Sequence, residues 1–100
     1  MVYVTQEQPG KNISPAMEFG ELKVLLPPGL EVAHSAGQVA ERLKVAMSSF
    51  NDNDYLLLIG DPVTIGISVA VAGFWNNGRV KMLKWDRQEH RYLPVACKLY

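Results

Sequence analysis

The segment YLLLIGDPVTIG, residues 55–66, constrains the fold of this chain more than any other. Residues 55–59 are apolar without alternation, which is typical of a strand covered on both faces, as in a parallel sheet between helices. The run breaks at Gly60-Asp61-Pro62, and an almost uncharged helical pattern follows over residues 63–75. A buried strand that leads directly into a helix predicts an α/β fold.

The rest of the pattern predicts a small α/β sandwich with parallel strands and two main helices. The first of these helices, residues 36–50, carries its apolar side chains along one stripe. Right-handed crossovers through the two helices are expected to make three strands parallel. These strands are residues 22–26, 55–59 and 79–85.

A C-terminal antiparallel strand is expected at residues 91–97, because only a short charged turn separates it from residues 79–85. Pro94 has no N–H to donate to a ladder, so this strand is expected at a sheet edge. Residues 2–5 also have strand composition, but the sequence leaves their place in the sheet open. At this length the chain, residues 1–100, is expected to be a single α/β domain.

The helix over residues 63–75 carries almost no polar side chain, so it is expected to be buried on every side. Its small residues are expected to pack against the sheet; they are Gly66, Ala70 and Gly73. The bulky Phe74 and Trp75 then need another cover, and we expect them to form the interface of a homodimer. The alternative is a monomer in which the N-terminal strand and loop fold back over this helix.

Composition excludes several classes of protein. The formal net charge is zero, which argues against attraction of the whole domain to nucleic acid, although residues 79–100 carry +4 and residues 1–78 carry −4. Cys97 is the only cysteine, so no internal disulfide or zinc–cysteine cluster is expected, and it fits a small buried apolar position. No signal peptide and no apolar stretch of the ~20 residues that span a membrane are found, which predicts a cytoplasmic protein.

The Gly60-Asp61-Pro62 turn allows two interpretations. Gly60 gives room for a ligand, and the N-terminus of the following helix offers N–H groups to a phosphate. Alternatively, Asp61 caps the helix and Pro62 occupies its first position. We favour the cap, because the Asp61 carboxylate would repel a phosphate and no phosphate-binding loop motif accompanies it. An amine or hydroxyl ligand on Asp61 stays open.

The basic C-terminal hairpin, residues 79–98, allows a nucleic-acid interpretation, in which its cations contact phosphates and its indole stacks on bases. The residues concerned are Arg79, Lys81, Lys84, Trp85, Arg87 and Arg91. The competing explanation is structural: Trp85 and Tyr92 pair across the hairpin, with the cations over their rings.

No convergent set of catalytic or metal-binding residues is apparent. His34 and His90 lie far apart in expected loops, and no clustered carboxylates or further cysteines accompany them. No serine has the flanking glycines of a nucleophile elbow. We therefore expect no enzyme activity, no cofactor and no metal.

Two segments resemble small proteins of unknown function from tailed, particularly marine, phages. They are DYLLLIGDPVTIGISVAVAGFWNNGRVKMLKWDRQEHRYLPV, residues 54–95, and VTQEQPGKNISPAMEFGELKVLLPPG near the N-terminus. The resemblance implies a cytoplasmic protein made in an infected bacterium and carries over no functional residue. Together with the absence of a catalytic set, it favours a non-enzymatic phage interaction or regulatory protein that binds a macromolecule. The alternative is a nucleotide- or nucleic-acid-binding module that uses the 60–62 crevice or the basic hairpin.

Overall fold

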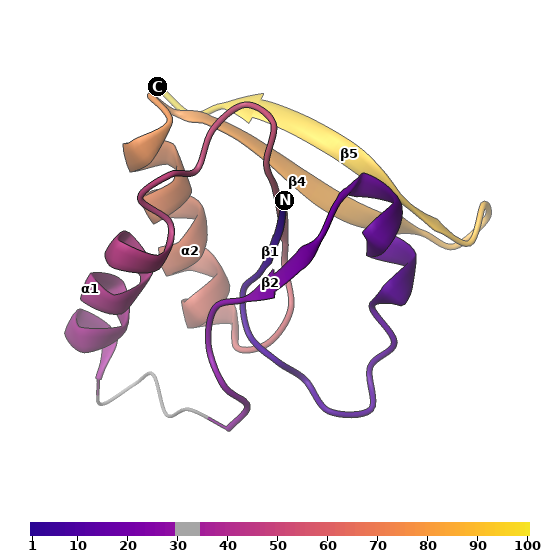
Figure 1. Cartoon of the computed structure of the whole chain (residues 1–100), viewed down its shortest axis with the longest axis horizontal. Helices are drawn as coiled ribbons and strands as arrows, with labels where there is room; N and C mark the ends of the chain where they lie inside the picture. The colour runs from indigo at the N-terminus through magenta and orange to yellow at the C-terminus, as the bar shows by residue number, and fades with distance from the viewer. Residues whose placement is uncertain (30–34) are drawn as a thin grey trace.

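The computed structural model describes residues 1–29 and 35–100 and contains a five-stranded sheet with helices on both faces. Two α-helices cover one face and a 3-10 helix, η1, packs on the other (Figure 1). Along the chain the elements are β1 (Val2–Val4), η1 (Ser14–Phe19), β2 (Leu22–Val24), α1 (Ala36–Ala46), β3 (Tyr55–Leu57), α2 (Pro62–Trp75), β4 (Arg79–Asp86) and β5 (Arg91–Lys98).

The strand order is β2-β1-β3-β4-β5, with β5 antiparallel to β4 and the other neighbours parallel. The expected α/β fold with its C-terminal hairpin is confirmed, but the parallel part of the sheet includes β1 as well as the three expected strands. Val2 and Val4 pack toward η1, while Tyr3 packs toward the α-helices. Because β1 fills both cores, it lies inside the sheet, between β2 and β3.

The prediction of a doubly covered strand at residues 55–59 is confirmed for its paired part. Leu56 is buried among the α-helices and Leu57 on the η1 side. The strand ends at Leu57. Beyond it, the backbone groups of Ile59 bond to the Thr5 side chain instead of to a neighbouring strand. The Ile59 N–H donates to Thr5 Oγ1 at 2.8 Å, and the same hydroxyl donates to the Ile59 carbonyl. The end of β3 is therefore held by the residue that follows β1.

The apolar stripe of the first helix is confirmed, because Val39, Leu43, Met47 and Phe50 are all buried in one core. The helix itself ends at Ala46 rather than at residue 50. A turn in which the Phe50 N–H bonds to the Met47 carbonyl then carries Phe50 onto Tyr3, with 5.6 Å between ring centroids.

The predicted packing face of α2 is wrong. Gly66 and Ala70 are exposed, and of the small row only Gly73 is buried. The helix instead buries a row of Thr64, Ser68 and Ala72, spaced i, i+4, i+8. These side chains are also small, and Ser68 Oγ donates to the Thr64 carbonyl at 2.8 Å, so its hydroxyl is satisfied inside the core.

The β4–β5 hairpin extends beyond the rest of the sheet (Figure 1). Leu57–Leu83 is the last pair between β3 and β4, whereas β4 continues to Asp86 beside β5. The edge position expected for the last strand is confirmed. Because β5 lies at the edge, Cys97 is exposed, and the expectation of a buried cysteine was wrong.

Candidate functional site

A cleft of about 560 Å³ opens where β3 ends and β4 continues. One wall is the end of β3 with the two residues after it, and the other is the distal part of β4. The loop after β1 contributes Lys11 and Asn12. This is the carboxyl edge of the parallel strands, where open α/β sheets bind ligands. We take this cleft as the candidate site.

Three cations line the cleft, Lys11, Lys84 and Arg87. Within residues 1–29 and 35–100 none of their side chains forms a hydrogen bond, an ion pair or a cation–π contact. No described carboxylate lines the cleft. The nearby Asp86 accepts the Gln88 N–H at 2.9 Å, so its carboxylate closes the hairpin turn. The lining of the cleft therefore carries three unpaired positive charges and no described negative charge, which favours an anionic ligand.

Trp85 and Tyr92 form an aromatic corner in this cleft, with ring centroids 4.9 Å apart in an edge-to-face arrangement. Tyr92 is buried, and burial raises the pKa of its phenol, which therefore stays neutral. Trp85 is 40% exposed, so part of the indole stays accessible to a ligand. The predicted cross-hairpin pairing of these two residues is confirmed, but the expectation of cations over their rings was wrong for the described residues, where Lys81 lies over Tyr55 instead.

The other cations of the predicted hairpin set lie elsewhere and have partners. Arg79 Nε lies 2.9 Å from Asp52, and Arg91 lies 2.7 Å from Glu18. Lys81 Nζ lies 4.3 Å from the ring centroid of Tyr55. Of the six predicted residues, the structure brings only Lys84, Trp85 and Arg87 together.

These ion pairs also perturb ionisation. Hydrogen bonds from Arg79 and Asn76 hold the pKa of Asp52 below its ordinary value, and the hydrogen bond to Glu18 raises the pKa of Arg91. Both effects favour the charged forms, so the two pairs persist at neutral pH.

Sequence reasoning missed Lys11, because it joins the cleft only through the insertion of β1 into the sheet.

The turn at Gly60 and Asp61 is built from structural contacts. Asp61 Oδ1 accepts the Val63 N–H at 2.8 Å, and Pro62 is the first residue of α2, so the predicted cap is confirmed. Gly60 has φ +105°, and an added Cβ would lie 2.4 Å from Gln6 Oε1. The glycine therefore makes room for Gln6. Neither Gly60 nor Asp61 lines the cleft, and their predicted role in ligand binding stays a prediction.

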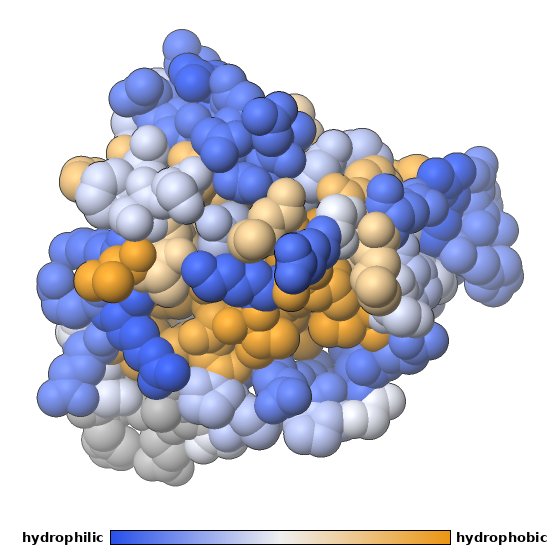
Figure 2. All heavy atoms as spheres, in the orientation of Figure 1, coloured by the Kyte–Doolittle hydropathy of each residue, from blue (hydrophilic) through white to orange (hydrophobic). Residues whose placement is uncertain are grey.

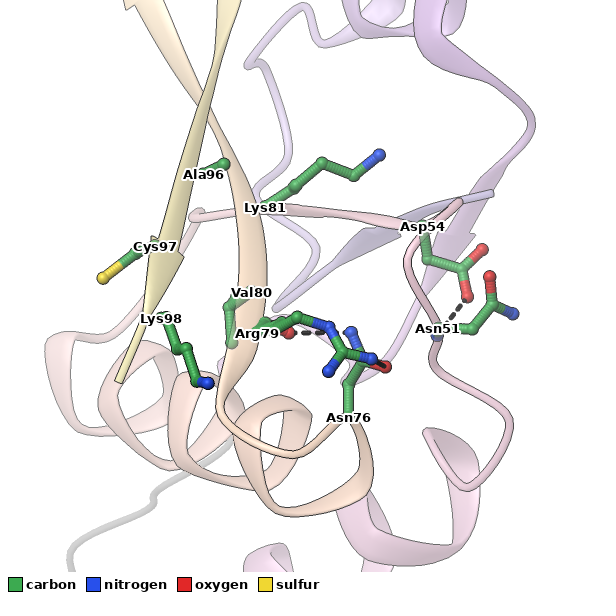
Figure 3. Close-up of a pocket in the computed structure, with 9 residues that line it drawn as sticks. All are labelled: Asn51, Asp54, Asn76, Arg79, Val80, Lys81, Ala96, Cys97 and Lys98. Carbon is green, nitrogen blue, oxygen red and sulfur yellow. Dashed lines mark hydrogen bonds between the residues drawn. The ribbon is translucent and has the colours of Figure 1, made fainter. Parts of the chain in front are cut away.

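A second cavity, of about 240 Å³, lies at the opposite end of the strands (Figure 3). Figure 3 shows Arg79 reaching toward Asn76 and the Cys97 sulfur pointing to the outside of the hairpin. The polar groups here largely satisfy one another: Asp54 accepts the Asn51 N–H at 3.0 Å, and Arg79 pairs with Asp52. The Lys81 and Lys98 ammonium groups, which also line this cavity, have no hydrogen bond or ion pair among the described residues.

The predicted interface residues differ in their surroundings. Phe74 is 61% exposed. Trp75 is 40% exposed, and its indole N–H donates to the Lys44 carbonyl at 2.9 Å, which ties α2 to α1. The N-terminal strand lies inside the sheet and η1 packs on the opposite face, so the alternative cover for α2, a folded-back N-terminus, is wrong.

Within the described residues, no group of three or more His, Cys, Asp and Glu side chains is placed to hold a metal ion. His90 lies in the exposed hairpin turn, and His34 lies outside the described residues. No helix in the described part of the chain is both long and apolar enough to cross a membrane.

A family model described as "Phage Pam3 gp32-like protein" matches residues 1–99. The chain belongs to the phage Pam3 gp32-like family. It is therefore a phage protein, as the resemblance of its sequence implied. No curated protein and no solved structure matches the chain. The description of the phage Pam3 gp32-like family gives no activity, so any function is inferred from the surfaces described above.

Proposed function

We propose that this phage protein is non-enzymatic, acts by binding a macromolecular partner, and works as a homodimer in the cytoplasm of a bacterium infected by a tailed phage. The observation that carries the proposal is the outer stripe of α2. It consists of Val63, Gly66, Ala70 and Phe74, spaced i, i+3, i+7, i+11, and all four are exposed. A helix of a globular protein normally turns polar side chains to solvent, so an apolar outer stripe indicates a surface that another molecule covers.

A second copy of the chain fits this stripe in shape. Gly66 and Ala70 make the middle of the stripe flat, so two helices can approach closely. Val63, 51% exposed, and Phe74, 61% exposed, stand at its ends. In an antiparallel pair of α2 helices about a two-fold axis, Phe74 of each copy would lie over the other copy's Val63. Each buried Phe or Val would contribute roughly 1.5–3 kcal/mol.

The acidic residues near the sheet support a non-enzymatic role, because they are engaged in holding the fold. Asp52 pairs with Arg79, Asp54 accepts the Asn51 N–H, and Asp61 caps α2. Each carboxylate serves a different structural contact. General acid–base chemistry instead needs such groups to converge on one substrate position.

The test is the mass of the chain in solution at micromolar concentration, by light scattering or sedimentation. The wild-type protein should have the mass of two chains. Phe74→Glu should reduce the mass to one chain, because two buried carboxylates would face the apolar stripe of the other copy. Val45→Glu is the matched control, since Val45 is an exposed apolar residue on α1, 78% accessible, and its substitution should leave the dimer intact.

A wild-type protein with the mass of one chain would refute the dimer. Loss of the dimer in Val45→Glu as well as in Phe74→Glu would assign the interface to a wider surface than the α2 stripe. In that case the proposed α2 interface is wrong.

A further inference from the structure

We propose that the cleft at the end of β3 binds a single-stranded nucleic acid, with a base stacked on Trp85 and phosphates held by Lys11, Lys84 and Arg87. This inference rests on the proposed function in one respect: the nucleic acid would be the macromolecular partner proposed above. The site lies on the hairpin and the loop after β1, and no residue of the outer stripe of α2 lines it. Binding and dimerisation can therefore be tested separately.

The distribution of paired and unpaired cations carries the electrostatic part of the inference. Of the other hairpin cations, Arg79 and Arg91 have carboxylate partners and Lys81 lies over an aromatic ring, whereas Lys98 is unpaired among the described residues but lies at the second cavity. The three cations of the cleft come from two segments far apart in sequence, and none has such a partner among the described residues. Unpaired cations gathered in a concave surface attract polyanions, and phosphates are the anions that such a surface binds in series.

The aromatic corner supplies the second element of single-strand recognition. Tyr92 packs edge-to-face against Trp85 and fixes the indole, which keeps part of its surface exposed in the cleft. An indole fixed beside unpaired cations is the arrangement on which unpaired bases stack without strong sequence preference. In a duplex the bases are already stacked on one another, so the same indole would contribute little.

The shape around Trp85 favours a chain over a single nucleotide. A second hollow, of about 470 Å³, shares Lys84, Trp85 and Arg87 with the cleft, and its lining also includes Asp86, whose carboxylate accepts the Gln88 N–H. Trp85 therefore lines both hollows. A strand can pass from one to the other across the indole, whereas a mononucleotide would occupy only one. In Figure 2 the tip of the hairpin, on the right, is hydrophilic, as expected of a surface that contacts phosphates.

Two further groups in the cleft are suited to polar contacts. From Lys84 onward β4 has no partner strand on the β3 side in the described part of the chain, so backbone groups along that side are available. Asn12 Oδ1 accepts hydrogen bonds from both the backbone and the hydroxyl of Ser14, at 3.1 and 2.7 Å. These bonds fix the loop and leave the amide N–H₂ of Asn12, which lines the cleft, without an acceptor among the described residues.

The test is fluorescence anisotropy of a labelled oligo-dT of roughly ten nucleotides, a length that one small domain covers, titrated with the full chain at low salt. The wild-type protein should bind, with an affinity that falls steeply as salt rises. The double variant Lys84→Glu/Arg87→Glu should weaken binding at least ~10-fold and reduce the salt slope by roughly 0.7 for each lost phosphate contact. Trp85→Leu should weaken it on the order of 10-fold, and Trp85→Phe less, because the phenyl ring still stacks.

Lys98→Glu is the control for charge, since Lys98 lies at the other end of β5 and lines the second cavity instead of the cleft. It should change the affinity far less than either cleft substitution. Thermal melts of all variants check that the fold persists, and Trp85→Phe keeps the test of the indole valid if Trp85→Leu unfolds.

Several results would overturn the proposal. They are no binding by the wild-type protein, equal affinity in the wild type and the double variant, or a loss in Lys98→Glu as large as in the double variant. Equal affinity for duplex of the same length, or full competition by thymidine monophosphate at an equal nucleotide concentration, would also refute a single-strand site. The mass of the double variant, measured in parallel, should equal that of the wild type, so failure of the cleft and failure of the α2 dimer give different results.

Discussion

Gln6 Oε1 accepts the backbone N–H of Asp61 at 2.9 Å, and this bond joins the end of β1 to the start of α2. The Gln6 side chain is buried, and its amide nitrogen donates to the Pro27 carbonyl at 3.2 Å, beyond the end of β2. One side chain therefore links three segments at the carboxyl edge of the sheet. This contact explains why the turn after β3 contains a glycine, and it leads to the first prediction.

Gly60→Ala should destabilise the protein by more than ~1 kcal/mol, because residue 60 has φ +105° and an added Cβ would lie 2.4 Å from Gln6 Oε1. Gly37→Ala on α1 is the matched control, since a Cβ there meets no atom of the described residues within 4 Å. The control should be neutral or stabilising by up to ~1 kcal/mol. Denaturant unfolding of both variants measures the difference. Equal stability of the two would contradict the close packing of Gly60 on Gln6.

Asp61→Ala should cost about 1 kcal/mol, because it removes the acceptor of the Val63 N–H, whereas Asp61→Asn and Asp61→Ser should cost much less. Thermal melts of the three variants test this order. If Asp61 instead binds a ligand, the Ala and Asn variants should lose binding equally at nearly unchanged stability. An unaltered melting temperature for the Ala variant would contradict the capping role.

Thr5 and Thr64 are both fully buried, but their hydroxyls have opposite surroundings. Thr5 Oγ1 bonds to both the N–H and the carbonyl of Ile59, whereas Thr64 Oγ1 has no hydrogen-bond partner among the described residues. Thr5→Val should therefore destabilise by about 1–3 kcal/mol, because it leaves buried Ile59 groups unsatisfied.

Thr64→Val makes the same change of shape and should be neutral or stabilising, since it removes a buried hydroxyl that has no hydrogen-bond partner in the described part of the chain. Chemical denaturation of the two variants side by side gives the comparison. A loss of stability in Thr64→Val as large as in Thr5→Val would show that the Thr64 hydroxyl is satisfied in solution.

Asp52 should make the stability depend on pH in the acid range. Hydrogen bonds from Arg79 and Asn76 hold its pKa in the folded state below the ordinary 3.8. A pKa that is lower in the folded state stabilises the fold above the unfolded-state pKa, and this contribution is lost as pH falls through the folded-state value. Asp52→Asn should thus be less stable than the wild type near pH 7, and the gap should close below about pH 4.

Urea unfolding across this pH range measures the difference in unfolding free energy between the wild type and Asp52→Asn. Arg79→Gln should show the same dependence of this difference on pH, because it removes the main partner of the carboxylate. The contribution should shrink at high salt, since the pair is at the surface. If the stability difference between the wild type and Asp52→Asn stayed constant below about pH 4, the effect of the substitution would not come from ionisation of Asp52.

Local features of the chain determined several parts of the fold. The unbroken apolar residues 55–59 produced a central strand because both of its faces must be buried. Asp61 and Pro62 determined where α2 begins, because the Asp61 carboxylate accepts a free N–H of the first turn and proline's φ is already fixed near the helical value. Neither effect depends on residues far away in the sequence. Pro94 marked an edge strand because it lacks an N–H. Each of these follows from groups within a few residues of one another.

Only the tertiary structure decided which face of α2 is covered and where β1 lies. The three residues of β1 can pair with any strand of matching length, and their position between β2 and β3 follows from filling the two cores at once. The position of β1 in turn brings Lys11 to Lys84 and Arg87. Likewise, Arg91 is neutralised by Glu18, 73 residues away, while Arg87 stays without a described partner. Charge pairing depends on neighbours in space, so the sequence identified the basic hairpin and the fold selected which of its cations face the cleft.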